Sequence, residues 1–233
     1  AETRQQEISP APQLPSTAIT LGSNATAVAP SRSHDGSTLL MINSHQPLTG
    51  PVSWYEAHLQ SGEGLNVMGG LFIGAPALGV GFNEHHGWGA TVNQPDLVDV
   101  YVLEMDPEDD NRYRVDDEWL ELESFDIPIK VLLWGWLPWT VKEKGYRSIH
   151  GPVMKTDHGT YALRYAGMDE IRQVEQWLAM SAATSFEEWR EAMALQHIAS
   201  FNFVYANADG DIHFVHNALM PRRAVGWQWD QYL

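Results

Sequence analysis

The chain of 233 residues contains no cysteine. Disulfide bonds, thiolate metal ligands and a cysteine nucleophile are therefore excluded for it. Basic residues are also scarce, since 14 Lys and Arg stand against 30 Asp and Glu, which gives a formal net charge of −16. This balance argues against a nucleic-acid partner, because neutralising phosphates requires clustered Lys and Arg. Most of the carboxylates are interpreted as a solvated and mutually repelling surface.

Long apolar runs are missing as well. No stretch reaches the ~18 uninterrupted apolar residues of a membrane-spanning helix, so no membrane partner is expected. The first 20 residues lack a basic segment followed by an apolar core, so no signal peptide is predicted there. Pro10, Pro12 and Pro15 instead indicate that residues 1–22 are a linker or the end of an upstream chain.

Two common catalytic signatures are absent too. The chain has neither a Gly-x-Ser-x-Gly nucleophile elbow nor a Gly-rich phosphate loop. Glu84, His85 and His86 stand together, but two adjacent histidines lack the i, i+4 spacing of a zinc helix. This cluster is interpreted as a turn between strands. A metal-dependent hydrolase that uses it stays open as an alternative.

What the chain does contain predicts a strand-rich fold. Apolar residues make up 44%, enough for a buried core, and ten Trp predict large aromatic packing sites. From 25 to 165, short apolar or alternating runs recur between Gly, Pro, Asn and Asp, as is typical of strands. One strand pair is expected over 127–141, with breaks at Gly135 and Pro138. Further strands are expected over 202–208 and 211–217.

Two helices are predicted between 170 and 197. The first, over 170–180, carries Ile171, Val174, Trp177 and Leu178 at helical spacing. The second begins at the capping box of Ser185 to Glu188 and runs to about 197. Strands, then helices, then strands again predict an α+β fold with a large sheet.

The pair Gly22-Ser23 is the most informative local feature. It separates the Pro-rich leader from an apolar run that is typical of a strand. If the bond before Ser23 were cut, the serine hydroxyl would be a nucleophile with its own α-amine as the nearest base. The amine suits this role because its reference pKa of about 7.7–8 is near working pH. The segment 42–47 follows one hairpin later and could return a polar side chain to Ser23.

Several motifs in this order resemble the β-chain of the penicillin acylase (penicillin amidase) family of N-terminal-nucleophile hydrolases. Within it, the acyl-homoserine lactone acylases are nearest. The motifs are Gly22-Ser23-Asn24-Ala25, Asn43-Ser44-His45, Trp88 to Asn93, Asp96 to Asp99, His150-Gly151-Pro152-Val153, Arg172-Gln173-Val174, and Tyr205-Ala206 through Pro221. The resemblance covers roughly 20–233. It implies an αββα sandwich, with 23–233 as a β-chain domain that is truncated on its C-terminal side.

The resemblance also implies roles for individual residues. Ser23 matches the serine that self-cleavage at Gly22-Ser23 releases as N-terminal nucleophile. Asn24 is expected to support its geometry, and His45 occupies a position that is His in lactone acylases and Gln in penicillin G acylases. The backbone N–H of Val92 matches half of the oxyanion hole. The other half is an Asn side chain that the family carries beyond position 233.

A calcium site is implied as well. Asp96, Val98 and Asp99, with a backbone oxygen of Pro221, match the calcium ligands of penicillin G acylases. Such oxygen donors suit a hard cation. The remaining carboxylates of that site would come from the other chain and from beyond 233. No cofactor is expected for the chemistry itself, and calcium would be structural.

The expected function is an amide hydrolase of the penicillin acylase type. Its substrate would be a small N-acyl amide, such as an acyl-homoserine lactone or a penicillin-type compound. The partner would be an α-chain from the same precursor, and the resemblance implies a periplasmic or secreted location. The alternative is an uncut or truncated precursor fragment, or a family-like binding protein, without catalytic activity. N-terminal sequencing, which gives either Ser23 or Ala1, separates the two.

Overall fold

The computed structural model describes residues 22–223, 225 and 226, so the expected linker over 1–22 lies outside the described residues except for Gly22. Its largest sheet has six antiparallel strands in the order β16-β15-β6-β5-β4-β3. Their bounds are β3 Trp54–Gln60, β4 Asn66–Phe72, β5 Val80–Asn83, β6 His86–Thr91, β15 Ser200–Asn207 and β16 Ile212–Ala218.

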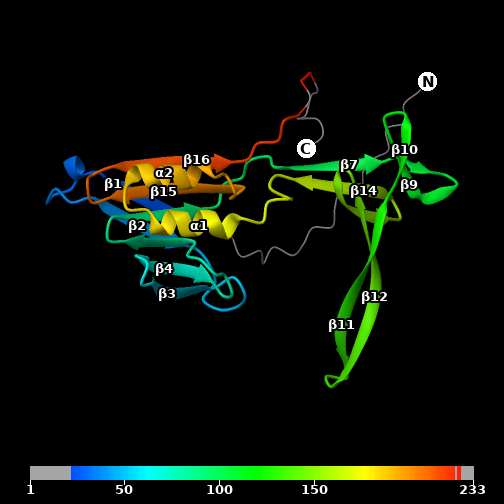
Figure 1. The fold of residues 1–233 in the computed structure, drawn as a ribbon, viewed down its shortest axis with the longest axis horizontal. Helices are drawn as coiled ribbons and strands as arrows, with labels where there is room; N and C mark the ends of the chain where they lie inside the picture. The colour runs from blue at the N-terminus through cyan, green and yellow to red at the C-terminus, as the bar shows by residue number, and fades with distance from the viewer. Residues whose placement is uncertain (1–21, 224, 227–233) are drawn as a thin grey trace.

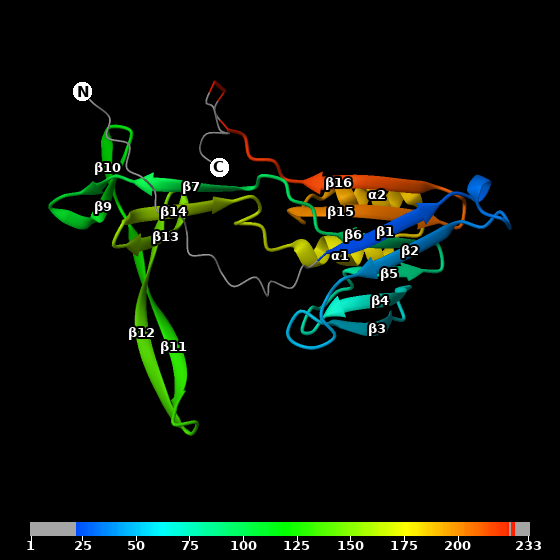
Figure 2. The same ribbon diagram turned by 180° about the vertical axis from the view of Figure 1, so that it is seen from behind.

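A hairpin and a pair of helices cover opposite faces of this sheet. The hairpin consists of β1 (Ser23–Val28) and β2 (Leu39–Ser44), with a short 3-10 turn, η1 (Pro30–Arg32), in its connection. The helices are α1 (Gln173–Ala182) and α2 (Phe186–Ala194). Figure 1 shows the helices in front of the sheet. In Figure 2, which is the view from behind, the hairpin lies in front. The described residues thus form helix, sheet and hairpin layers, and the second helical layer of the expected αββα sandwich is not among them.

The alternation of β6 explains how both faces are covered. Trp88 is fully buried and belongs to the main core, together with Trp189 of α2 and Phe203 of β15. Successive side chains of a strand point to opposite faces, so Gly87 and Gly89 face the hairpin. The glycines leave a flat surface there, and the hairpin packs directly onto it.

The remaining strands form a second group with its own small core. A five-stranded sheet has the order β11-β12-β13-β14-β7, and a three-stranded sheet has the order β10-β9-β8. The core of this group consists of Leu103, Tyr113, Leu122 and Ala162. The bounds are β7 Val98–Leu103, β8 Met105–Asp106, β9 Asp109–Val115, β10 Glu118–Glu121, β11 Glu123–Leu133, β12 Leu137–Ser148, β13 Gly151–Thr156 and β14 Gly159–Tyr165. In both ribbon views β11 and β12 form a long arm (Figures 1 and 2).

The predicted break at Pro138 is wrong, because Pro138 lies within β12 opposite Leu132. Here β12 pairs with β11 alone, since its pairing with β13 is confined to 146–148. The missing N–H of Pro138 therefore leaves no ladder bond unmade on the other side of the strand. The chain reverses instead at Trp134 and Gly135, whose φ values of 52° and 79° are typical of a tight hairpin turn.

The first helix begins three residues later than predicted. Glu170 is held outside it by Arg172, whose backbone N–H and guanidinium both donate to the Glu170 carboxylate at 2.5–2.9 Å. These bonds lower the pKa of Glu170 to about 2. Ile171 is consequently 90% exposed rather than part of the helical face. The second helix matches its prediction at the start, where the Ser185 side chain accepts the Glu188 N–H, and ends earlier, at Ala194.

Among the described residues, no helix combines the length and the apolar character needed to cross a bilayer.

Candidate active site

The Gly22-Ser23 bond lies at the start of β1, as predicted. The Ser23 hydroxyl donates to the carbonyl oxygen of Gly22 at 2.5 Å. The backbone N–H of His45, just past β2, donates to the same oxygen at 2.9 Å. The hairpin register produces this arrangement, because Ser23 lies directly opposite Ser44. Two donors therefore polarise the carbonyl group that precedes the serine, with the serine hydroxyl beside it.

The His45 ring is held by a pair of asparagines. Asn24 and Asn43 face each other across the hairpin, and their side-chain nitrogens lie 3.1 and 3.4 Å from Nε2 of His45. Amide nitrogens only donate, so this network assigns Nε2 as acceptor and places the ring proton on Nδ1. A Cβ at Gly22 would lie 3.2 Å from that Nδ1, which puts the ring next to the Gly22-Ser23 bond.

The predicted oxyanion donor, Val92, follows directly after β6. The position of β6 under the hairpin is fixed by close contacts: a Cβ at Gly89 would lie 2.9 Å from Cβ of Ala25. A Cβ at Gly87 would lie 2.8 Å from Cδ2 of Leu40.

These contacts also define how β1 and β6 run relative to each other. Leu40 pairs with Ala27, so Ala27 stacks near Gly87 just as Ala25 stacks near Gly89. One further step of two residues along each strand leads to Ser23 and to Thr91, the neighbour of Val92. The nucleophile candidate and the oxyanion candidate therefore lie toward the same end of the two layers.

A row of polar side chains on three adjacent strands lies beside this end, and it was not predicted from the sequence. Thr91, Asn202 and His216 lie opposite one another on β6, β15 and β16. Asn202 donates to the Thr91 hydroxyl at 3.2 Å and accepts from Nδ1 of His216 at 2.8 Å. Thr91 shares its face of β6 with Gly89, so the row points to the hairpin side. The alternation Gly87-Trp88-Gly89 was the available sequence signal, because it indicates a strand face without side chains that another layer can approach closely.

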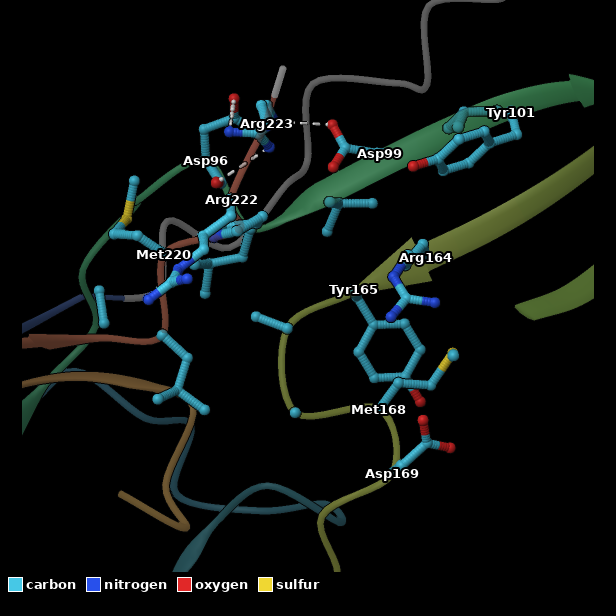
Figure 3. A pocket seen from close by; sticks show the side chains of 18 of the residues that line it. Asp96, Asp99, Tyr101, Arg164, Tyr165, Met168, Asp169, Met220, Arg222 and Arg223 are labelled. Carbon is cyan, nitrogen blue, oxygen red and sulfur yellow. Dashed lines mark hydrogen bonds and ion pairs between the residues drawn. The ribbon is translucent and has the colours of Figure 1, made fainter. Parts of the chain in front are cut away.

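The residues predicted to bind calcium lie together, and Arg223 contacts two of them. Asp96, Val98, Asp99 and Pro221 line a cavity of about 1810 Å³, and Ser23 is not among its lining residues. Figure 3 shows Arg223 directed at both Asp96 and Asp99. Its Nη1 lies 3.0 Å from Oδ2 of Asp96, and its Nε donates to Oδ1 of Asp99 at 2.9 Å. A guanidinium thus lies between the two carboxylates. Within 22–223, 225 and 226, no three His, Asp or Glu side chains could jointly hold a metal ion.

In the Glu84-His85-His86 cluster, His86 has a structural role. His86 is 4% exposed, and its Nε2 donates to the carbonyl oxygen of Met180 in α1 at 3.1 Å. Burial lowers the pKa of His86 to about 4, so the ring is neutral at physiological pH. It stacks on Tyr205 with ring centroids 5.2 Å apart. His86 therefore joins the helix layer to the sheet.

Comparison with known proteins gives a consistent picture. The chain matches the family described as penicillin amidase over residues 1–233. It is 30% identical over 212 residues to an acyl-homoserine lactone acylase PvdQ of Pseudomonas fluorescens strain Pf0-1, which covers 88% of this chain and 27% of that protein. It is 26% identical over 208 residues to penicillin G acylase of Escherichia coli, covering 88% of this chain and 24% of that protein.

A solved structure agrees with the sequence relatives. The thermostable penicillin G acylase from Alcaligenes faecalis superposes with a TM-score of 0.73 at 27% identity, over 89% of this chain and 37% of that one. The strand-rich fold with two helices is thus shared with a penicillin G acylase. The chain spans 27% of the length of the first curated relative it matches.

Proposed function

The chain belongs to the penicillin amidase family, and from this premise we propose that it is the catalytic segment of an acylase. In this proposal Ser23 becomes an N-terminal nucleophile and carries the acyl group of an N-acyl amide. The observation that carries the proposal is the Gly22 carbonyl oxygen, which accepts from both the Ser23 hydroxyl and the His45 backbone N–H.

Release of the nucleophile is the first proposed step. Oγ of Ser23 attacks the carbonyl carbon of Gly22, the C–N bond breaks, and the hydroxyl proton passes to the Ser23 nitrogen, which becomes the free amine. Water then hydrolyses the ester between Gly22 and Ser23, which leaves a carboxylate on Gly22 and restores the hydroxyl. During the attack negative charge develops on the Gly22 oxygen, where the His45 N–H already donates at 2.9 Å.

Amide hydrolysis would follow on the same hydroxyl. The new α-amine of Ser23 accepts the hydroxyl proton while Oγ attacks the substrate carbonyl carbon. The backbone N–H of Val92 stabilises the resulting oxyanion, the amine product leaves with the proton, and water deacylates Ser23. The stacking of β1 on β6 supports this role for Val92, since it brings the ends of the two strands together.

The substrate class we propose is an aliphatic N-acyl amide such as an acylated homoserine lactone. His45 supports this choice through its resemblance to the lactone acylases. The relatives named acyl-homoserine lactone acylase support it as well. Asn24 and Asn43, which bind Nε2 of His45, are the neighbours through which this residue is positioned.

The decisive variant is Ser23→Ala, with Ser37→Ala as matched control. Ser37 lies exposed in the connection between β1 and β2, where it bonds to Asp35. We expect Ser23→Ala to leave the peptide bond after Gly22 intact and to lower hydrolysis by at least ~10³-fold, because the attacking atom is lost. Intact-mass analysis and a hydrolysis assay measure the two effects. An uncut wild-type chain with full activity, or an active Ser23→Ala variant, would contradict the proposal.

A further inference from the structure

Two connecting segments leave the six-stranded sheet at the same end. One follows β6 and leads through 92–97 into β7, and the other follows β16. Because β6 and β16 are both antiparallel to β15, they run in the same direction, so their carboxyl ends are neighbours. The predicted oxyanion donor, Val92, lies on the first of these segments.

Arg223 joins the two segments. Its Nη1 pairs with Oδ2 of Asp96 at 3.0 Å, its Nη2 donates to the backbone oxygen of Asp96 at 3.2 Å, and its Nε donates to Oδ1 of Asp99 at 2.9 Å. Its side chain is only 15% exposed, compared with 24% for Asp99 and 45% for Asp96. The bond to Asp99 raises the pKa of Arg223, so the guanidinium keeps its charge. Three donors of one planar group thus bind three oxygens of the short segment 96–99.

This geometry does not fit a calcium ion. Calcium takes about 6–8 oxygen ligands at about 2.3–2.6 Å. Here the oxygens of Asp96 and Asp99 are bound to nitrogen at 2.9–3.2 Å.

We propose that Arg223 is the built-in cation of the 96–99 segment, which leads into β7, and that the protein needs no calcium there. The guanidinium takes the place that the family resemblance gives to the metal ion. A covalently attached cation cannot be removed by chelation. The planar guanidinium group also fixes the directions of its hydrogen bonds, which an ammonium group would not reproduce.

The same contact has a positioning role. The connection between β6 and β7 is anchored near its start by Asn93, whose side chain donates to the Asn217 backbone oxygen at 2.9 Å and accepts from the Ser200 hydroxyl. Val92 directly precedes this doubly anchored stretch. Arg223 is thus a positioning residue, which acts on the backbone of 92–99 rather than on a substrate.

The first test measures calcium directly in the whole protein. After desalting, elemental analysis is expected to find less than ~0.1 calcium per protein, and excess EGTA is expected to shift the thermal midpoint by less than ~1 °C, as a linkage argument requires when no metal binds the folded state. One tightly bound calcium per protein, together with a midpoint that falls by more than ~5 °C in EGTA, would overturn the proposal.

The second test removes the guanidinium. Arg223→Gln is compared with Arg222→Gln, which removes the same charge from the adjacent residue lining the same cavity. We expect Arg223→Gln to lower the midpoint by about 5 °C or more and Arg222→Gln by less than ~1 °C, because only Arg223 holds both carboxylates. Arg223→Lys is expected to fall between wild type and Arg223→Gln, since it keeps the charge and loses the fork. Equal thermal midpoints for the two Gln variants would contradict the proposed role of Arg223. This test does not depend on whether the protein hydrolyses amides.

Discussion

At the scale of single residues, the orientation of the His45 ring is set by hydrogen bonds to its neighbours. Asn24 and Asn43 both direct amide nitrogens at Nε2 from opposite strands of one hairpin. Donors on that atom assign Nε2 as the acceptor and leave Nδ1, the atom nearest Gly22, as the donor of the ring. The family resemblance gave Asn24 and His45 separate roles near Ser23 and did not predict a contact between them. It did not single out Asn43, because a cross-strand neighbour is known only once the register is fixed.

The first residue-scale prediction concerns this network. Asn24→Ala removes the 3.1 Å contact to Nε2, and we expect kcat to fall about fivefold with little change in KM, since a hydrogen bond to a positioned group is worth about 1 kcal/mol. Asn66→Ala is the matched control, because Asn66 forms a similar side-chain bond to His58 at 2.7 Å, on β3 and β4. Equal losses in the two variants would mean that Asn24 has no special role.

A second residue-scale prediction follows from His86. Its pKa is about 4 in the folded chain and 6.5 in the unfolded reference. Between these values the unfolded chain binds the extra proton, so stability is fully present above pH 6.5 and is lost as the pH falls through 4. We expect His86→Gln, which can still donate to the Met180 oxygen, to flatten this dependence. Thermal midpoints from pH 7 to pH 4 measure it, and identical slopes for both proteins would refute the assignment.

At the scale of elements, patterning predicted the hairpins and helices better than their ends. Apolar runs between turn residues located the β1 start at Ser23 and the turn at Gly135, whose φ is 79°. The start of α1 was missed because an ion pair between Glu170 and Arg172 competes with helical bonding, which periodicity does not reveal. Pro138 was missed because tolerance of proline depends on whether a strand has a second neighbour.

The close packing of the hairpin on β6 gives the element-scale prediction. Gly89→Ala would place a Cβ 2.9 Å from Cβ of Ala25 and 3.0 Å from Cγ1 of Ile42. The hairpin would have to move, so we expect a loss of about 1–3 kcal/mol in stability, with slower cleavage at Gly22-Ser23. Gly62→Ala is the control, since no atom lies within 4 Å of its added Cβ. Denaturant midpoints and intact-mass time courses measure both effects, and a Gly89→Ala protein that behaves like Gly62→Ala would contradict this account.

At the scale of the whole molecule, two separate hydrophobic clusters support two groups of strands. The sequence predicted a large sheet with two helices, and the structural likeness to a penicillin G acylase bears out the fold at that level. The contacts of Arg223 could not be predicted, because its partner Asp99 lies 124 residues away in sequence. The chain also spans only 27% of the length of its first matched relative. Substrate choice is therefore a question for the whole protein.

The whole-molecule prediction is a preference among acyl groups. We expect the whole protein to hydrolyse long-chain acyl-homoserine lactones with a kcat/KM at least ~10-fold above that for phenylacetyl amides, a difference of about 1.4 kcal/mol in transition-state binding. Amine release measured for a matched panel of acyl chains tests it. Hydrolysis of phenylacetyl amides with lactones left untouched would contradict the proposed substrate class while leaving the Ser23 mechanism in place.

The shared carbonyl oxygen of Gly22 has a consequence for the order of events in biosynthesis. One of its two donors, the His45 N–H, comes from the far end of the second hairpin strand and arrives only when β2 has paired with β1. In the proposed mechanism, self-cleavage would therefore wait until the nucleophile's own strand pairing is complete. Cleavage at Gly22-Ser23 would then depend on correct folding of the hairpin. Chains that misfold there would stay inactive precursors, and only chains with paired β1 and β2 would mature.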